Sequence, residues 1–240
     1  MAIQPIPGDT IELWPFLLDE SPQRFETLVK ALVDDEQSKI DQGIFPQIGR
    51  RGAISRAGLR HILSSYLQIS PQDISLVEGE HGKPALRGGE FSFNLSHTGK
   101  YALLAVSSEG QLGVDLEQIR GEAPIDELAQ RCFSPEELKQ WLQYREEQRL
   151  ISFFHLWAQK EAFLKAHGGG LTIPLQDFDC LVDPSAQQGL IRSRIEGDTE
   201  RTWRVVGGET GENLRYAMVW DGAEKSVRHR DPEEAGLSRW

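Results

Sequence analysis

The chain has 240 residues, of which 39% are hydrophobic, so it is long enough to bury a sizeable core and is not expected to be disordered. The net charge of −11 at pH 7 argues against nucleic-acid binding, because an acidic surface repels a phosphate backbone. Two cysteines, Cys132 and Cys180, are too few for a disulfide scaffold and do not have the spacing of a zinc site.

Neither end of the sequence predicts a membrane segment. The first residues lack the basic start and apolar run of a signal peptide. The longest apolar stretch, residues 101–106, is far shorter than the roughly 20 residues needed to span a bilayer. We therefore expect a cytoplasmic protein with no membrane partner.

Hydrophobic periodicity predicts the elements in chain order. The predicted strands cover residues 11–14, 91–96, 101–106, 111–117, 171–182, 201–206 and 216–220. The predicted helices start near Ser21 and Ser134 and cover residues 51–67 and 146–167, with Gly168-Gly169-Gly170 after the last one. This order predicts an α+β (mixed α/β) fold. We expect an N-terminal subdomain 1–108, a C-terminal subdomain 109–221 and a flexible tail 222–240.

A basic segment interrupts this acidic chain. No Asp or Glu occurs between Asp41 and Asp73. Guanidinium groups match phosphate oxygens in a bidentate way, which favours a small anion-binding site. A solvated helix face with chance segregation of charge would give the same pattern. The basic residues of this segment are Arg50, Arg51, Arg56, Arg60 and His61.

Paired acids occur on the predicted strand 111–117. Asp115 and Glu117 are two residues apart, so both side chains would point to the same face. Two adjacent carboxylates repel unless a cation lies between them, and Mg²⁺ takes one or two carboxylates together with substrate phosphates. The alternative is the exposed polar face of an edge strand.

A third acid lies on the predicted helix 146–167. Glu161 and Lys165 are four residues apart and share one helix face. An acid on a mostly apolar stripe needs a partner or a metal, although a simple Glu–Lys pair would also satisfy it. The strand 91–96 ends in donors, Asn94, Ser96 and His97, which favour either a phosphate cradle or an ordinary turn.

Taken in order, these pieces resemble the Sfp-type 4′-phosphopantetheinyl transferases. The resemblance covers roughly residues 20–182, and Phe133 to Glu137 also fits the family's helix start. Each motif is weak alone, whereas four in order at compatible spacings are specific. The four motifs are Gly82-Lys83-Pro84, Phe93-Asn94-Leu95-Ser96-His97, Gly113-Val114-Asp115-Leu116-Glu117 and Trp157 to Lys165 with the pattern W-x-x-K-E-x-x-x-K.

The resemblance implies a pseudo-twofold fold of two similar subdomains, with coenzyme A bound in the cleft between them. It implies that Asp115, Glu117 and Glu161 hold Mg²⁺ against the pyrophosphate and that Lys165 contacts this group. His97 and Ser96 would contact the 3′-phosphate and neighbouring groups. The remaining contacts to coenzyme A would come from Arg51, Lys83, Pro84, Asn94 and Lys160.

Two departures from the family pattern stand out. Family members often have Gly-Lys-Gly where this chain has Gly168-Gly169-Gly170, so a phosphate contact from that lysine would be missing. Gly52 stands where a hydroxyl side chain can occur beside the arginine. The register in this region is open, and Arg50 could take the role of Arg51.

The implied activity is transfer of 4′-phosphopantetheine from coenzyme A to a serine of an apo carrier protein, with release of adenosine 3′,5′-bisphosphate. Asp115, Glu161 and Lys165 would be catalytic, and Glu161 could act as the base or as a metal ligand. The carrier would be an acyl carrier protein or a carrier domain of a fatty-acid, polyketide or peptide synthase, and the family length suggests a monomer.

Because carrier proteins are usually acidic, docking should use a local patch. The segment 118–133, with Arg120, Arg131 and Phe133, follows the predicted strand 111–117 that carries Asp115 and Glu117, and it is our expected docking site for the carrier. Two rival functions remain: a metal-dependent hydrolase of the coenzyme A pyrophosphate, and a non-catalytic homologue that binds coenzyme A or a carrier.

Overall fold

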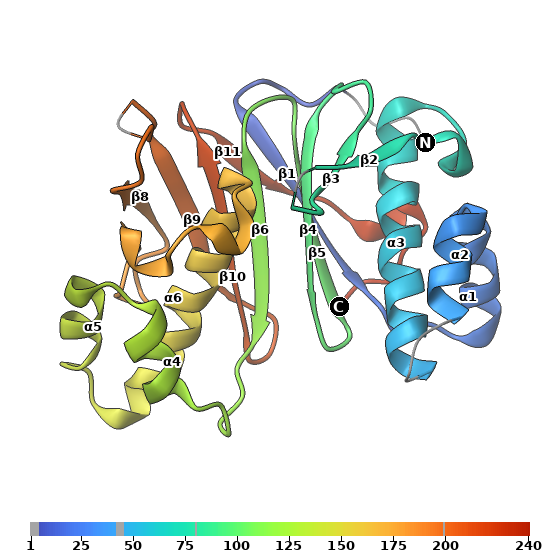
Figure 1. The fold of residues 1–240 in the computed structure, drawn as a ribbon. Coiled ribbons are helices and arrows are strands. Elements are labelled where there is room, and N and C mark those ends of the chain that lie inside the picture. Colours follow the sequence, from blue (N-terminus) through green and yellow to red (C-terminus); the bar gives the residue numbers. More distant parts are fainter. Residues whose placement is uncertain (1–4, 42–45, 80, 199) are drawn as a thin grey trace.

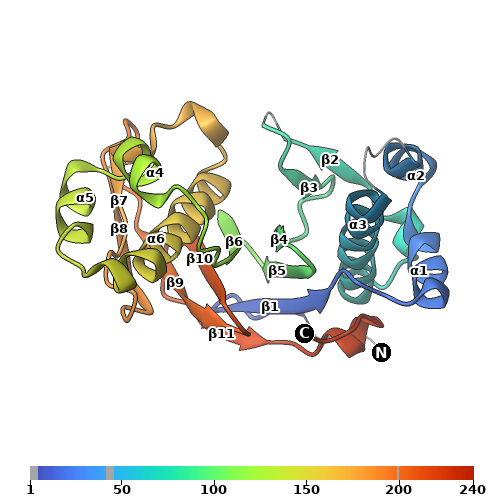
Figure 2. The same ribbon diagram turned by 90° about the horizontal axis from the view of Figure 1, so that it is seen from below.

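The computed structural model describes residues 5–41, 46–79, 81–198 and 200–240 (Figure 1). Two sheets form its centre, and a long helix lies on the outer side of each: α3 (Pro46–Leu67) on one side and α6 (Glu146–His167) on the other. The expected α+β fold class is confirmed. Figure 2 shows the two helices on opposite sides of the paired sheets, with β1 and β11 along one edge of the view.

The first sheet has the strand order β11-β1-β5-β4. A tight hairpin joins β4 to β5, with Thr98 opposite Tyr101. The helices α1 (Pro22–Leu28) and α2 (Asp34–Asp41) lie beside α3 on the side away from the sheet. The strands of this sheet are β1 (Thr10–Leu17), β4 (Ser92–Thr98), β5 (Tyr101–Ser107) and β11 (Ser226–His229), and a small separate pair is formed by β2 (Leu76–Glu78) and β3 (Pro84–Leu86).

The second sheet has the strand order β6-β10-β9-β8-β7. The helix α6 lies across it, and α4 (Ile125–Cys132) and α5 (Pro135–Trp141) pack on the outer side of α6. The strands of this sheet are β6 (Leu112–Gln118), β7 (Phe178–Asp179), β8 (Gln188–Ser193), β9 (Trp203–Thr210) and β10 (Leu214–Asp221).

Three clusters of buried side chains follow from this layering. One packs α3 against the first sheet, a second packs α6 against the second sheet, and a third lies between the two sheets. The third cluster explains the alternation of β6, because Val114 and Leu116 are buried in it, as predicted. The polar residues Asp115 and Glu117 therefore point the other way, towards α6.

Local sequence signals set the helix ends that frame the site. At α5, which starts near Ser134 as predicted, the Ser134 hydroxyl accepts from the Glu137 backbone N–H, and the Glu137 carboxylate accepts from the Ser134 N–H, which forms a capping box. At α6 the cap Gly168 has φ 84°, a left-handed conformation that glycine adopts readily. The helix predicted at residues 51–67 starts earlier, at Pro46.

The predicted strand 171–182 is wrong. The segment is mostly two 3₁₀ turns, Gly170–Thr172 and Leu175–Asp177, and within it only β7 pairs with a neighbour. Pro174 separates these turns and has no N–H for a ladder.

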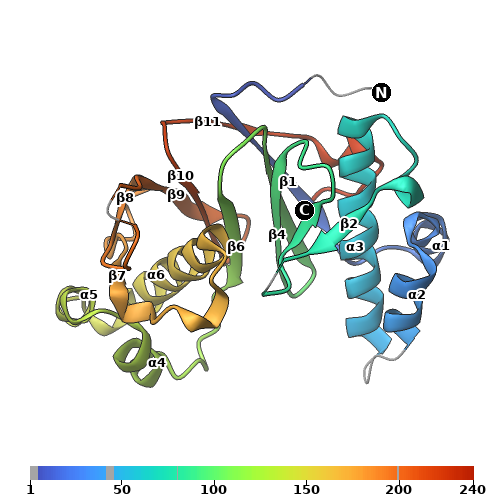
Figure 3. The same cartoon turned by 45° about the horizontal axis from the view of Figure 1, so that its top comes forward.

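The segment 222–240, expected to be a flexible tail, is folded onto the first half (Figure 3). Its strand β11 pairs in parallel with β1, placing Ser226 opposite Thr10, and Leu237 is buried in the first core. The few apolar residues of this segment hid that packing. The division into subdomains at residues 108 and 109 stays a prediction: β5 ends in the first sheet at Ser107, and β6 starts in the second at Leu112.

Candidate active site at the seam between the two sheets

The strands β4 and β6 lie side by side at the centre of the molecule, but they belong to different sheets (Figures 1 and 3). Side chains of β4 join them. The Asn94 Oδ1 accepts from the Val114 N–H at 2.7 Å, and the Ser96 Oγ accepts from the Leu116 N–H at 3.3 Å. Side chains thus take the place that backbone carbonyls have in a continuous sheet. We call this contact between β4 and β6 the seam.

Close packing of α6 on β6 brings the helix to the same place. A Cβ at Gly113 would lie 2.1 Å from the Ala162 carbonyl oxygen and 2.4 Å from the Ala166 nitrogen, both backbone atoms of α6. Only glycine fits at that distance. Ala162 and Ala166 directly follow Glu161 and Lys165, so this contact determines how far those two side chains stand from β6.

Lys165 and Asp115 form the centre of the site. The Lys165 Nζ donates to Asp115 Oδ1 at 2.6 Å, to Ser96 Oγ at 2.9 Å and to the Val114 carbonyl at 3.2 Å. Ser96 Oγ donates to the same Asp115 oxygen at 2.9 Å. The other oxygen, Oδ2, is buried and accepts no hydrogen bond from the described residues. A buried carboxylate oxygen without a donor suits a bound cation.

The two glutamates experience the field of Asp115. Burial raises the pKa of Glu117 to about 7, and the neighbouring Asp115 charge adds to the rise. Burial and Asp115 likewise raise the pKa of Glu161. The Glu117 Oε1 accepts from the Trp157 indole N–H at 3.1 Å, and the Arg120 guanidinium is 3.9 Å from the other oxygen. Mutual repulsion of this kind is relieved by a shared cation.

The donor set fits a hard divalent ion, although the described residues contain no ready-made group of three metal-ligating side chains. Carboxylate oxygens are the ligands that Mg²⁺ prefers, and this ion usually keeps several waters and substrate oxygens rather than an all-protein cage. The orphaned Oδ2 of Asp115 and the raised pKa values of both glutamates agree with that chemistry. The metal set of Asp115, Glu117 and Glu161 stays a prediction.

A cavity of about 260 Å³ opens beside these groups and is lined by both halves of the chain. Lys83 reaches across it and donates to the Leu112 and Lys165 carbonyls, both at 2.7 Å. Burial lowers the pKa of Lys83 to about 8. Lys83 therefore ties the β2–β3 loop to β6 and to the last turn of α6, in addition to lining the cavity. Other lining residues are His81, Pro84, Asn94, Glu161 and Lys165.

His97 lies at the end of β4, next to this group. Its pKa lies below the ordinary value because burial disfavours the charged ring and Lys165 repels it. The ring is therefore neutral near pH 7. An arriving phosphate would raise this pKa by favouring the imidazolium form.

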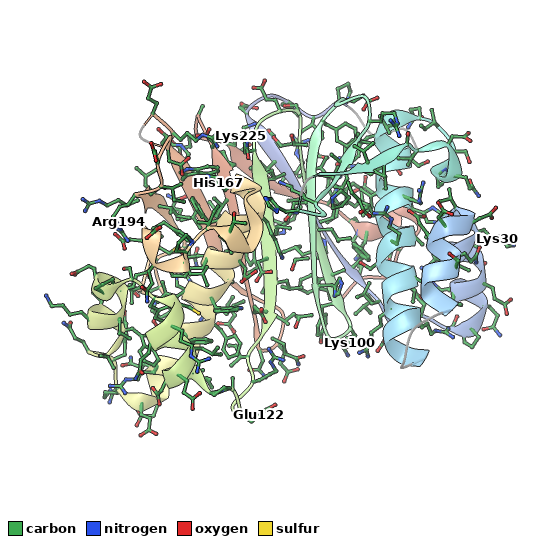
Figure 4. All side chains as sticks on the ribbon, in the orientation of Figure 1. Lys30, Lys100, Glu122, His167, Arg194 and Lys225 are labelled. Carbon is green, nitrogen blue, oxygen red and sulfur yellow. The ribbon has the colours of Figure 1, made fainter. Side chains whose placement is uncertain are left out.

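The basic segment of α3 is engaged mainly with acids of the chain. Arg51 makes a bidentate pair with Asp19, at 2.7 Å and 2.9 Å, while Arg56 and Arg60 both bind Glu36. Arg51 holds the pKa of Asp19 below its usual range, and Lys100 and Arg50 add to this effect. Lys100 is at the tip of the β4–β5 hairpin (Figure 4). The phosphate contact predicted for Arg51, or for Arg50 in its place, stays a prediction.

Lys160 does not have the predicted contact with coenzyme A. Its side chain is fully buried, 2.8 Å from Glu137 Oε2, and it donates to the Leu175 and Phe178 carbonyls. Glu137 also accepts from the Cys180 N–H at 2.7 Å. Lys160 and Glu137 thus join α5, α6 and β7 from inside the protein. Lys160 precedes Lys165 by five residues rather than three or four, so the two lysines occupy different faces of α6.

Phe133, expected in the docking segment, is buried at 1% exposure and packs against Trp141 and Phe153. It cannot touch a partner. Arg120 and Arg131 are exposed. Sequence reasoning missed Gly113 and Trp157 as parts of the site, although both lie in quoted motifs. Gly113 is a glycine in a strand, which signals close approach of another backbone.

Comparisons with known proteins give the family. Residues 19–109 match the family described as 4′-phosphopantetheinyl transferase, N-terminal, and residues 111–219 match the 4′-phosphopantetheinyl transferase superfamily. The 4′-phosphopantetheinyl transferase HetI of Nostoc sp. is 35% identical over 183 residues, 74% of this chain and 76% of HetI. The chain therefore belongs to the 4′-phosphopantetheinyl transferase superfamily, as its motifs predict.

Two other proteins of similar sequence agree with this assignment. The 4′-phosphopantetheinyl transferase Sfp of Bacillus subtilis is 28% identical, covering 71% of this chain and 74% of Sfp. The L-aminoadipate-semialdehyde dehydrogenase-phosphopantetheinyl transferase of Homo sapiens is 29% identical, covering 88% of this chain and 74% of its own length. A crystal structure of holo-[acyl-carrier-protein] synthase from Thermotoga maritima matches 48% of this chain and 63% of its own at a TM-score of 0.31 and 20% identity.

Proposed function

We propose that the protein transfers the 4′-phosphopantetheine arm of coenzyme A to a serine of an apo carrier protein and releases adenosine 3′,5′-bisphosphate. One observation carries the proposal: Asp115, Glu161 and Lys165 come together beside a cavity lined by both halves of a family member. Anionic and cationic groups at a shared cavity suit the positioning of a diphosphate.

We further propose that Asp115, Glu117 and Glu161 hold Mg²⁺. When bound, such an ion neutralises charge on the diphosphate and aligns it for in-line displacement. Asp115 is the best supported of the three, because its Oδ2 is buried and accepts no hydrogen bond from the described residues. Lys165 would move from Asp115 Oδ1 to a diphosphate oxygen, which changes one anionic partner for another.

In the transfer step the carrier serine Oγ forms a bond to the phosphorus that bears pantetheine. The bond from that phosphorus to the bridging oxygen breaks, and its electron pair leaves with adenosine 3′,5′-bisphosphate. The serine proton passes to Glu161, whose raised pKa improves it as a base at neutral pH. Tight metal binding would weaken Glu161 as a base, so its two roles compete.

Docking of the carrier is proposed on the exposed part of the segment 118–132. Its charge is mixed, because Glu122, Asp126 and Glu127 lie between Arg120 and Arg131. Arg120→Glu and Arg131→Glu should raise the carrier KM. Because Arg120 also lies 3.9 Å from Glu117, the KM for coenzyme A is expected to stay unchanged only in Arg131→Glu. Arg192→Glu, an exposed residue on β8, is the matched control. Unchanged carrier KM in both variants would place docking elsewhere.

The activity is tested with coenzyme A, MgCl₂ and an apo acyl carrier protein, followed by intact mass. A phosphopantetheine mass gain supports transfer, breakdown of coenzyme A without that gain supports a hydrolase, and no change supports a binding homologue. A carrier with serine replaced by alanine is the control. Asp115→Ala and Glu161→Gln should each lower kcat by about 10²-fold or more, and near-normal turnover in both would refute the site.

The proposal includes a monomer acting in the cytoplasm on carriers of fatty-acid, polyketide or peptide synthases. The monomer is supported by the cavity, because a single chain supplies the residues on both of its sides. Within the described part of the chain no helix is long and apolar enough to cross a membrane. Sedimentation at increasing concentration tests the monomer, and a panel of apo carriers tests the substrate.

A further inference from the structure

The hydroxyl of Ser96 has all of its hydrogen-bonding capacity engaged inside the protein. A serine hydroxyl has one donor and two acceptor lone pairs. The donor goes to Asp115 Oδ1 at 2.9 Å, and the acceptors take the Lys165 ammonium at 2.9 Å and the Leu116 N–H at 3.3 Å. The side chain is buried, with 6% of the residue exposed. No donor remains for a phosphate oxygen.

We infer that Ser96 is a positioning residue that orients Asp115 across the seam, and that it does not bind a phosphate of coenzyme A. A phosphate could take the Ser96 proton only if Asp115 lost it. That exchange would leave a buried carboxylate oxygen with one donor fewer, which is unfavourable.

The strand pairing explains why this one hydroxyl can position a carboxylate. Ser96 lies opposite Leu103 of β5 in the first sheet, and Asp115 lies opposite Ala217 of β10 in the second. Each residue is thus fixed by its own sheet. The hydrogen bond between them connects the two sheets, so it fixes the carboxylate plane relative to both halves of the site.

The orientation has a chemical consequence. Asp115 Oδ1 receives two donors, from Ser96 and from Lys165, whereas Oδ2 receives none from the described residues. Ser96 therefore turns one oxygen inward and leaves the other for a cation. This step rests on the proposed metal site, and its consequence is measurable without turnover.

The test uses Ser96→Ala and Ser96→Thr, with Ser152→Ala as the matched control. Ser152 is a buried serine that donates to the Val182 carbonyl at 2.8 Å within the second half. Binding of Mn²⁺ alone is followed by the electron paramagnetic resonance of the free ion. Binding of coenzyme A is measured by calorimetry in EDTA. Melting temperatures report folding.

Ser96→Ala should weaken Mn²⁺ binding about 10–100-fold, the usual effect of losing a hydrogen bond to a metal-binding carboxylate. Its metal-free affinity for coenzyme A should stay within about threefold of wild type. Ser96→Thr keeps the hydroxyl and should restore Mn²⁺ binding. Ser152→Ala should change neither affinity.

Two results would overturn the inference. One is weaker metal-free binding of coenzyme A with unchanged Mn²⁺ affinity, which would make Ser96 a phosphate contact. The other is unchanged affinity for both ligands. If Ser96→Ala does not fold, Ser96→Cys keeps the side-chain volume with a weaker hydrogen-bonding group and should give intermediate Mn²⁺ affinity. Mn²⁺ titration remains decisive even if the mass assay shows no transfer, so failure of the proposed function is distinguishable.

Discussion

Replacing Gly113 with alanine tests whether contact between α6 and β6 determines the geometry of the site. The new Cβ would lie 2.1 Å from the Ala162 carbonyl oxygen, whereas real Cβ contacts essentially never fall below 3.0 Å. The helix must retreat by about 0.9 Å at this point, which follows from the same two distances. Because Ala162 and Ala166 adjoin Glu161 and Lys165, both reactive side chains would move away from Asp115.

Two magnitudes follow for Gly113→Ala. Overpacking a tight contact costs about 1–3 kcal/mol, which for a chain of this size lowers the melting temperature by about 2–12 °C. A displacement near 1 Å in a catalytic constellation costs about 10²-fold in rate. We therefore expect a folded protein with kcat lowered about 10²-fold, measured by transfer of labelled phosphopantetheine well below the melting temperature.

The matched control is Gly58→Ala on α3. Its Cβ would lie 2.6 Å from Cε2 of the Phe16 ring in the first core. This change also overpacks a core, but a side chain absorbs the clash far from the acids. It should lower the melting temperature and leave kcat within about threefold. A folded Gly113→Ala with normal kcat would refute the argument, and so would an equal loss of kcat in Gly58→Ala.

Three further predictions concern buried charge. Lys160→Met should lower the free energy of unfolding in urea by about 3–5 kcal/mol, because Glu137 is left as a buried unpaired charge, whereas Arg239→Met at the surface should change it little. In EDTA the free energy of unfolding of the wild type, relative to that of Glu117→Gln, should fall as pH rises from 4.5 to about 7, since native Glu117 then binds a proton that the unfolded chain has lost. Comparison with Glu117→Gln cancels the contributions of other buried groups with shifted pKa values, such as Glu161 and His155. Lys83→Met should cost about 1–3 kcal/mol by leaving two buried carbonyls without a donor. Relative to Lys83→Met, the wild type should gain stability between pH 8 and 10.5, where unfolded Lys83 is protonated and native Lys83 is not.

Each of these has a contrary outcome. Lys160→Met as stable as wild type would mean that Glu137 takes up a proton at little cost. A constant difference in unfolding free energy between the wild type and Glu117→Gln from pH 4.5 to 7 in EDTA would mean that Glu117 is ionised in the metal-free protein. A constant difference in unfolding free energy between the wild type and Lys83→Met above pH 8 would mean that burial does not lower the pKa of Lys83.

The sequence predicted the elements whose formation depends on residues close together in the chain. The alternation around Phe93 and the run from Tyr101 gave the β4–β5 hairpin, and Gly168 marked the end of α6, because period and capping depend on neighbours in sequence. The strand β11 was missed for the opposite reason. It has four residues, Ser226–His229, and it becomes a strand only because β1 offers an open edge.

The sequence predicted the pairs of candidate site residues that lie on one strand or one helix. It did not predict the contacts between residues of two different elements. Spacing placed Asp115 beside Glu117, and Glu161 beside Lys165, which needs only the periods of strand and helix. The seam needs the relative position of two sheets, which no periodicity encodes. Lys160 shows the limit clearly: its place in a motif suggested a ligand, whereas its helix face buries it against Glu137.

The contacts across the seam give the quoted motifs a structural meaning besides their chemical one. From the first half, Lys83 binds the start of β6 and the end of α6, and Asn94 and Ser96 bind the backbone N–H groups of Val114 and Leu116. From α6, Lys165 binds Ser96. Each motif therefore supplies at least one contact that joins the halves. The position of a reactive side chain between the two halves depends on every contact that holds the halves together. Substitutions at Asn94 or Lys83 should accordingly reduce activity even where the altered side chain touches no substrate.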